Sequence, residues 1–259
     1  MNAKPKLHAA NVVVRLGDAL IVDGAALDLR AGELTVLIGP NGAGKTTLMR
    51  ALAGLVPAEG RIEIEGSPLN ALTGRDRARR IAYLPQGHVF HWPMPVEAVV
   101  ALGRYPYADA FSAVTDADRQ AVAKALAATG TEGFAHRAVT TLSGGERARV
   151  ALARALACEA SILLADEPTV SLDPRHQLVV MELLVRAARS GGAVLAIGHD
   201  LALAARFADR IVIMDRGRLV ADGSPRDVLT VERIAAVFGV EAMIAEDRSG
   251  THPVLLRPL

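Results

Sequence analysis

A glycine-rich run between an apolar segment and a helical pattern constrains the fold of this chain more than any other feature. Residues 39–46 read Gly-Pro-Asn-Gly-Ala-Gly-Lys-Thr and match the pattern G-x-x-x-x-G-K-[ST] at every fixed position. The preceding segment Leu34–Ile38 has the length of a buried strand, and Lys45–Ala53 has helical spacing. A strand, a glycine loop and a helix in this order predict an α/β fold built on a parallel sheet.

The glycine loop is predicted to hold phosphate groups. Its glycines let backbone N–H groups approach an anion closely, and the start of the following helix adds a favourable dipole. Lys45 supplies a positive charge for the β- and γ-phosphates of a nucleotide, and Thr46 supplies a hydroxyl ligand for magnesium. The flanking strand and helix disfavour a chance glycine loop. The residues expected to bind the nucleotide here are Gly39, Pro40, Asn41, Gly42, Ala43, Gly44, Lys45, Thr46 and Thr47.

Further short apolar runs, bounded by Gly, Asp or Pro, predict more buried strands with helices between them. The predicted strands are Ile81–Leu84, Ile162–Ala165, Val194–Ile197 and Ile211–Met214, and two of the helices are Pro174–Ala188 and Leu201–Phe207. Residues 1–35 and 61–66 alternate in polarity, which is typical of antiparallel strands.

Residues 95–157 differ from the rest because they carry helical patterns and almost no strand pattern. The predicted helices are Pro95–Arg104, Asp116–Ala128 and Ser143–Cys158. We therefore expect a helical insertion in an α/β core. The tail predicts a weak hairpin, with strands at Met243–Ala245 and Val254–Leu256.

The composition excludes several classes of protein. Hydrophobic residues make up 51% of the 259 residues and charged residues 22%, which excludes a disordered chain. The net charge of +1 argues against a nucleic-acid partner held by bulk charge. The single cysteine, Cys158, cannot form an intrachain disulfide, and no apolar run approaches the ~20 residues that span a bilayer. We expect a cytoplasmic protein.

Two acidic residues follow a predicted buried strand. Asp166 and Glu167 come directly after Ile162–Ala165, and the carboxyl ends of strands in open α/β sheets are where ligands bind. Such a pair on its own often marks a solvated turn. Beside a phosphate loop, however, Asp166 is expected to hold magnesium and Glu167 to orient or deprotonate the attacking water.

Three other features are ambiguous when each is taken alone. Ser143 and Glu146 have the spacing of a capping box, so Leu142–Glu146 can simply begin a helix, although a helix start with two glycines also binds anions. Gln86 and His199 each follow a predicted strand, where such residues are usually structural.

Taken together and in this order, the features resemble the ATP-binding subunit of an ABC transporter. The resemblance rests on residues 39–46, Gln86, 142–146, 162–167, Ser171–Asp173 and His199. It implies a P-loop NTPase fold: a core with a mixed or parallel sheet, an N-terminal antiparallel β subdomain and an inserted helical subdomain. It also implies one ABC ATPase domain over 1–259, with a core of 1–86 and 159–259, a helical part of 87–158 and a hairpin tail of 240–259.

The resemblance further implies cofactors, partners and residue roles. ATP and Mg²⁺ would lie between two chains in a head-to-tail homodimer, with Ser143, Gly144 and Gly145 of one chain closing on the ATP of the other. Asp173 would communicate across the interface, and His199 would contact the γ-phosphate. Gln86 would contact magnesium and the attacking water. The catalytic set is then Lys45, Gln86, Glu167 and His199, and the metal set is Thr46, Gln86 and Asp166.

One departure from the family pattern concerns the adenine. Many members stack it on an aromatic residue near the N-terminus, whereas this chain has no aromatic residue before Tyr83. Arg15 or Leu16 is expected at that position. An Arg15 guanidinium can stack on a π face in place of an aromatic ring.

A second resemblance suggests the kind of transporter. Residues 99–106, which end in Leu-Gly-Arg-Tyr-Pro, are similar to ATPases of importers for ferric siderophores, haem and cobalamin. An integral membrane permease and, indirectly, an extracytoplasmic substrate-binding protein would be partners, and the chain would lie on the cytoplasmic face of the membrane. Phe90 and Trp92 are expected to contact the permease, whereas Tyr83 is expected in the core. The alternatives are an importer of another substrate and a soluble ABC ATPase without a transport role.

Overall fold

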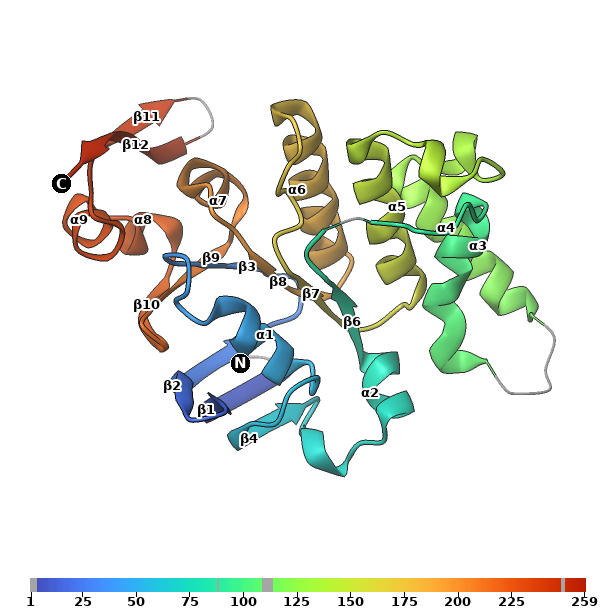
Figure 1. Ribbon diagram of the computed structural model, residues 1–259, viewed down its shortest axis with the longest axis horizontal. Helices are drawn as coiled ribbons and strands as arrows, with labels where there is room; N and C mark the ends of the chain where they lie inside the picture. Colours follow the sequence, from blue (N-terminus) through green and yellow to red (C-terminus); the bar gives the residue numbers. More distant parts are fainter. Residues whose placement is uncertain (1–3, 88, 109–113, 248–249) are drawn as a thin grey trace.

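The computed structural model describes residues 4–87, 89–108, 114–247 and 250–259, and it combines a parallel sheet, an antiparallel sheet and a group of helices (Figure 1). The strands are β1 (Leu7–Leu16), β2 (Ala19–Leu29), β3 (Leu34–Ile38), β4 (Glu59–Ile64), β5 (Ser67–Pro68), β6 (Ile81–Leu84), β7 (Ile162–Ala165), β8 (Ala193–Ile197), β9 (Arg210–Asp215), β10 (Arg218–Gly223), β11 (Val240–Asp247) and β12 (Gly250–Pro258). The α-helices are α1 (Lys45–Leu52), α2 (Gly74–Arg80), α3 (Val96–Ala101), α4 (Asp116–Thr129), α5 (Gly144–Ala157), α6 (Pro174–Arg189), α7 (Leu201–Phe207), α8 (Pro225–Val228) and α9 (Val231–Phe238). Short 3-10 helices lie at Leu69–Ala71, Leu102–Tyr107, Glu132–Phe134 and Val139–Thr141.

The central sheet has the strand order β10-β9-β3-β8-β7-β6. Every neighbouring pair is parallel except β10 with β9, which is antiparallel. The sheet is therefore mixed, as expected. The carboxyl ends of β3, β6, β7 and β8 meet at one edge, and this edge carries the glycine loop and the residues that follow the other three strands.

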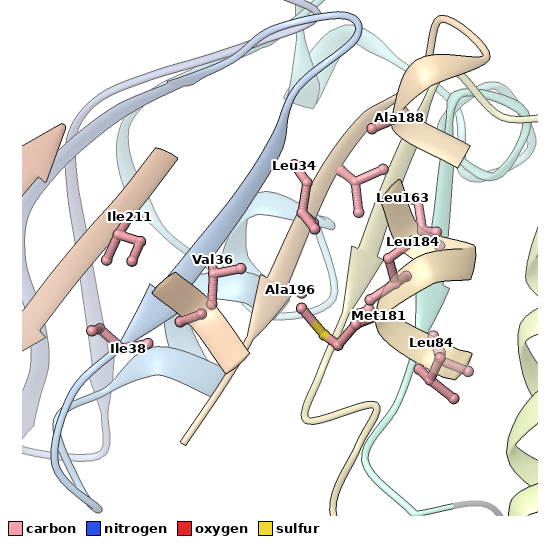
Figure 2. Close-up of a cluster of buried hydrophobic side chains, with 14 of the residues drawn as sticks. Leu34, Val36, Ile38, Leu84, Leu163, Met181, Leu184, Ala188, Ala196 and Ile211 are labelled. Atoms are coloured by element: carbon pink, nitrogen blue, oxygen red, sulfur yellow. The ribbon is translucent and has the colours of Figure 1, made fainter. Parts of the chain in front are cut away.

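The central sheet is covered on both faces, which explains why its strands are apolar at consecutive positions. On one face, Leu34, Val36 and Ile38 of β3 belong to an apolar cluster that also contains Met181, Leu184 and Ala188 of α6 (Figure 2). On the other face, Leu37 joins a cluster formed with α1 and with the antiparallel sheet of order β2-β1-β4-β5. The predicted antiparallel N-terminal strands are thus confirmed.

Helices α3, α4 and α5 gather at one side of the molecule (Figure 1) and share an apolar cluster of their own. Val96 and Val100 of α3 pack there against Leu126 of α4 and Val150 of α5. The helix expected at Pro95–Arg104 is divided, because α3 ends at Ala101 and a 3-10 helix follows. A Cβ atom at Gly103 would lie 2.2 Å from the Arg154 carbonyl oxygen, so this turn packs directly on the α5 backbone.

The chain ends in the predicted hairpin, β11 paired with β12, which stands beside α7, α8 and α9 (Figure 1). None of the helices in the described ranges has the length and apolarity to cross a membrane.

Candidate nucleotide site

The glycine loop between β3 and α1 is held by backbone on both sides. A Cβ atom at Gly39 would lie 2.0 Å from the carbonyl oxygen of Met214 in β9, and one at Gly44 would lie 2.7 Å from that of Ile21 in β2. Gly44 also has a φ of 103°, which disfavours any residue with a side chain. These two positions therefore require glycine, and the loop keeps a fixed shape.

Lys45 folds back over this loop. Its Nζ donates hydrogen bonds to the carbonyl oxygens of Gly39 at 2.7 Å and Pro40 at 2.9 Å. Burial lowers the pKa of Lys45 below its usual value, although the Glu167 and Asp166 carboxylates act in the opposite direction. An ammonium group has three donors, so Lys45 can keep both carbonyls and still donate to a phosphate oxygen.

Asp166 lies at the end of β7 with none of its surface exposed. Its Oδ1 accepts a hydrogen bond from the Thr46 hydroxyl at 3.0 Å, and its Oδ2 accepts one from the Tyr83 hydroxyl at 3.0 Å. Its backbone N–H donates to the carbonyl oxygen of Leu84 at 2.8 Å. A hydroxyl beside a carboxylate oxygen is a suitable donor set for Mg²⁺, which prefers oxygen ligands. The residues present therefore fit the metal that such a loop requires.

The Glu167 side chain contacts two predicted catalytic residues, which follow the strands on either side of β7. Gln86 Nε2, two residues after β6, donates to Glu167 Oε2 at 2.5 Å, and His199 Nε2, two residues after β8, contacts Oε1. The parallel order β6-β7-β8 places these three residues at one edge of the sheet. Glu167 thus lies beside Thr46 and Asp166, the two residues suited to bind Mg²⁺. At this position its carboxylate can accept a proton from water.

A second group of candidates lies at the starts of α5 and α6. Ser143 caps α5 in a capping box with Glu146, and Asp173 caps α6 by accepting from the His176 backbone N–H at 3.0 Å. The other Asp173 oxygen pairs with His176 Nδ1 at 2.8 Å, and these bonds hold the pKa of Asp173 below its usual value. A Cβ atom at Gly145 would lie 2.1 Å from the His176 ring. His176 therefore connects Asp173 with Gly145.

The structure brings some sequence candidates together and keeps others apart. Lys45, Thr46, Gln86, Asp166 and Glu167 lie in one group with His199. Among the described residues, no hydrogen bond or ion pair connects this group with Ser143, Gly144, Gly145 or Asp173.

Arg15 belongs to neither group but is exposed near the end of β1, in register with Leu20 of β2. Ile21, the next residue, approaches Gly44. The end of this strand pair therefore lies beside the glycine loop, as a residue near the nucleotide base requires.

Sequence reasoning missed the polar roles of two residues. The Tyr83 ring packs against the core as expected, but its hydroxyl reaches Asp166. Burial raises the pKa of that hydroxyl, so it remains a donor at neutral pH. His176 lies outside every motif in the sequence. Tyr83 lies one residue before the end of the predicted strand Ile81–Leu84, so only the pairing of this strand with Ile162–Ala165 could have indicated its contact with Asp166.

The aromatic residues that follow Gln86 are divided between surface and core. Trp92 and Tyr105 are 76% and 79% exposed. Phe90 is half-buried against two apolar clusters, and Tyr107 donates its hydroxyl to the Cys158 carbonyl oxygen at 3.0 Å. Only part of this group therefore forms an exposed surface.

A strand, a phosphate loop and a helix, with a carboxylate at the end of another parallel strand of the same sheet, define a P-loop nucleotide-binding protein. The family model described as "ABC transporter" matches residues 22–170. The chain belongs to this family, and it is a subunit that binds and hydrolyses ATP.

Named relatives agree with this assignment. The chain is 47% identical over 231 residues to the hemin import ATP-binding protein HmuV of Streptomyces coelicolor, covering 89% of this chain and 82% of that protein. It is 43% identical to the cobalamin import ATP-binding protein BtuD of Halobacterium salinarum, covering 98% and 63%. A solved metal-chelate type ABC transporter in an inward-facing conformation superposes with a TM-score of 0.84 at 26% identity, covering 98% of both chains.

Proposed function

We propose that this ATPase subunit drives import of haem, or of a related iron chelate or cobalamin, through an integral membrane permease. The proposed catalytic mechanism rests on one observation. Glu167 contacts Gln86 and His199, and this group lies beside Thr46 and Asp166. The proposed cargo is supported by the relatives named for hemin and cobalamin import and by the metal-chelate type of the superposed transporter.

The proposed chemistry is attack of water on the γ-phosphate of ATP. Lys45 and the loop N–H groups hold the phosphates, and Glu167 accepts the proton of the attacking water. Gln86 and His199 orient the Glu167 carboxylate and contact the water and the γ-phosphate, respectively. Thr46, Asp166 and Gln86 would hold Mg²⁺, which neutralises charge on the phosphates when bound.

The proposed active form is a head-to-tail homodimer. The two groups of candidate residues are separate within one chain. Each contains a feature that can bind an anion, which is the glycine loop in one group and the start of α5, with two glycines, in the other. Two chains placed head to tail bring Ser143, Gly144 and Gly145 of one protomer onto the ATP of its partner. Asp173 lies at the start of α6, near the start of α5, and would face the partner.

The remaining parts of the proposal concern domains and partners. The division between a core (1–86 and 159–259) and a helical part (87–158) is supported by the apolar cluster that α3, α4 and α5 share. A hairpin tail (240–259) is supported by the pairing of β11 with β12. The permease would contact the segment after Gln86, and a substrate-binding protein would act outside the membrane. The chain would lie on the cytoplasmic face, without nucleic acid.

Reconstitution tests the proposed function. The subunit is combined in lipid nanodiscs with a permease encoded beside its gene, and ATP hydrolysis is measured with binding protein loaded with haem, a ferric siderophore or cobalamin. We expect one loaded form to stimulate hydrolysis. If an active ATPase complex responds to none of the three, the proposed cargo class is wrong.

Trp92→Ala tests the proposed permease contact. Trp92 is exposed, and among the described residues no hydrogen bond or ring contact connects it with a candidate catalytic residue. We therefore expect basal ATPase activity to stay within about twofold and co-purification with the permease to fall. Leu55→Ala is the matched control, since Leu55 is also exposed but follows α1. Equal co-purification of the Trp92 variant and the wild type would contradict the proposal.

Arg15→Ala tests how the adenine is held. Stacking of a base on an aromatic ring contributes about 1–3 kcal/mol, and an exposed guanidinium should contribute less. We expect the Kd for ATP to rise by less than about fivefold and the unmodified chain to distinguish ATP from GTP weakly. Titration with labelled nucleotides measures both, with Arg61→Ala as the control. Strict selectivity for ATP over GTP would contradict this prediction.

A further inference from the structure

Tyr83 joins three structural elements around one buried carboxylate. It lies on β6, its ring packs against the apolar cluster, and its hydroxyl donates to Asp166 Oδ2 at 3.0 Å. The guanidinium of Arg50, on α1, lies near the same hydroxyl. The Tyr83 hydroxyl therefore lies near a cationic side chain and donates to the Asp166 carboxylate.

Each oxygen of Asp166 has a different hydroxyl partner. Oδ1 faces the Thr46 hydroxyl, whereas Oδ2 faces Tyr83. A carboxylate rotates about its last bond unless both oxygens are held, and this one is fully buried. The hydrogen bond from its backbone N–H to Leu84 also ties Asp166 to β6. Strand β6 therefore fixes both the backbone and the side chain of Asp166.

We propose that Tyr83 is a positioning residue for the metal site. Its hydroxyl binds Oδ2 of Asp166 and so keeps Oδ1 beside the Thr46 hydroxyl. Oδ1 and the Thr46 hydroxyl oxygen are then aligned before a divalent cation binds with the nucleotide. This inference rests on the proposed role of Asp166 as a metal ligand. Groups that orient a metal ligand typically change metal affinity by about 10–100-fold when removed.

Tyr83→Phe removes the donor and keeps the ring. The probe is Mn²⁺, which suits the same oxygen ligands as Mg²⁺, and its binding is measured by electron paramagnetic resonance with saturating ADP. We expect the Kd for Mn²⁺ to rise about tenfold, while ADP binding in EDTA stays unchanged. The matched control is Tyr107→Phe, because Tyr107 is also half-buried and also donates its hydroxyl, but to the Cys158 carbonyl.

A second variant keeps the test usable if Tyr83→Phe folds poorly. Arg50→Lys keeps a positive charge near Asp166 but removes the guanidinium beside the Tyr83 hydroxyl, and we expect a smaller rise in the same Kd. Thermal unfolding is followed for all variants. A lower melting temperature with an unchanged Mn²⁺ affinity would show a merely structural role for Tyr83 and overturn the inference.

Asp166→Asn distinguishes a failure of the positioning role of Tyr83 from a failure of the proposed metal-ligand role of Asp166. If Asp166→Asn leaves Mn²⁺ binding unchanged, the proposed ligand role of Asp166 fails. If Asp166→Asn weakens Mn²⁺ binding but Tyr83→Phe does not, only the positioning role of Tyr83 is overturned. Weakening by both variants, with the Tyr107 control unchanged, supports the inference.

Discussion

Glu167→Gln should nearly abolish ATP hydrolysis while ATP binding persists. The amide has the size of the carboxylate and can still contact Gln86 and His199, but it cannot accept a proton from water. Loss of a general base typically costs about 10²–10⁴-fold in rate. Phosphate release measures turnover, and labelled ATP measures binding. Because ATP is bound but not consumed, we also expect a dimer that persists in size-exclusion chromatography with ATP.

The control for this variant is Glu97→Gln. Glu97 also contacts a histidine, His136, at 3.2 Å, but it lies on α3, away from the sheet edge. We expect the isolated subunit with this change to hydrolyse ATP normally. Hydrolysis by Glu167→Gln at the wild-type rate would remove Glu167 from the role of base.

The sequence predicts the apolar strands of the central sheet better than the polar strand at one of its edges. Leu34–Ile38 and Ile162–Ala165 inside the sheet, and Ile81–Leu84 at the other edge, are confirmed residue for residue, because a strand with both faces covered is a continuous apolar run. Strand β10 (Arg218–Gly223) was not predicted. It pairs only with β9 at the edge, and its residues alternate between exposed and half-buried positions. Such a strand forms because of its neighbour, not its own pattern.

Some residues of the candidate site are likewise predictable from local sequence patterns, whereas others depend on how distant elements pack. The glycine loop and the acidic pair after β7 are local patterns tied to strand ends, so the sequence predicts where they lie. The contact of Tyr83 with Asp166 depends on the register of β6 against β7, where Tyr83 pairs with Leu164. The contact of His176 with Gly145 depends on how α6 packs beside α5. Neither arrangement has a local sequence signature.

The contact between His176 and Gly145 makes a second large effect testable. We expect Gly145→Ala to reduce ATP hydrolysis by about 10²-fold, because an error of about 1 Å in a catalytic arrangement costs that much. The new methyl group would lie 2.1 Å from the His176 ring, which Asp173 holds by a hydrogen bond, so either this ring or the start of α5 must shift. ATP binding to single chains should persist, because the glycine loop is separate from this contact.

Relief of the clash distinguishes this explanation from a general loss of stability. Alanine is more favourable than glycine within a helix by about 1 kcal/mol, so unfolding need not become easier. In the double variant Gly145→Ala, His176→Ala, the ring is absent, and we expect most of the lost activity to return, a coupling that separate effects would not produce. Gly74→Ala is the control, since a methyl group at that helix start meets nothing within 4 Å. If the double variant is as inactive as Gly145→Ala alone, then the ring is not the cause, and the glycine is required by the ATP of the partner protomer instead.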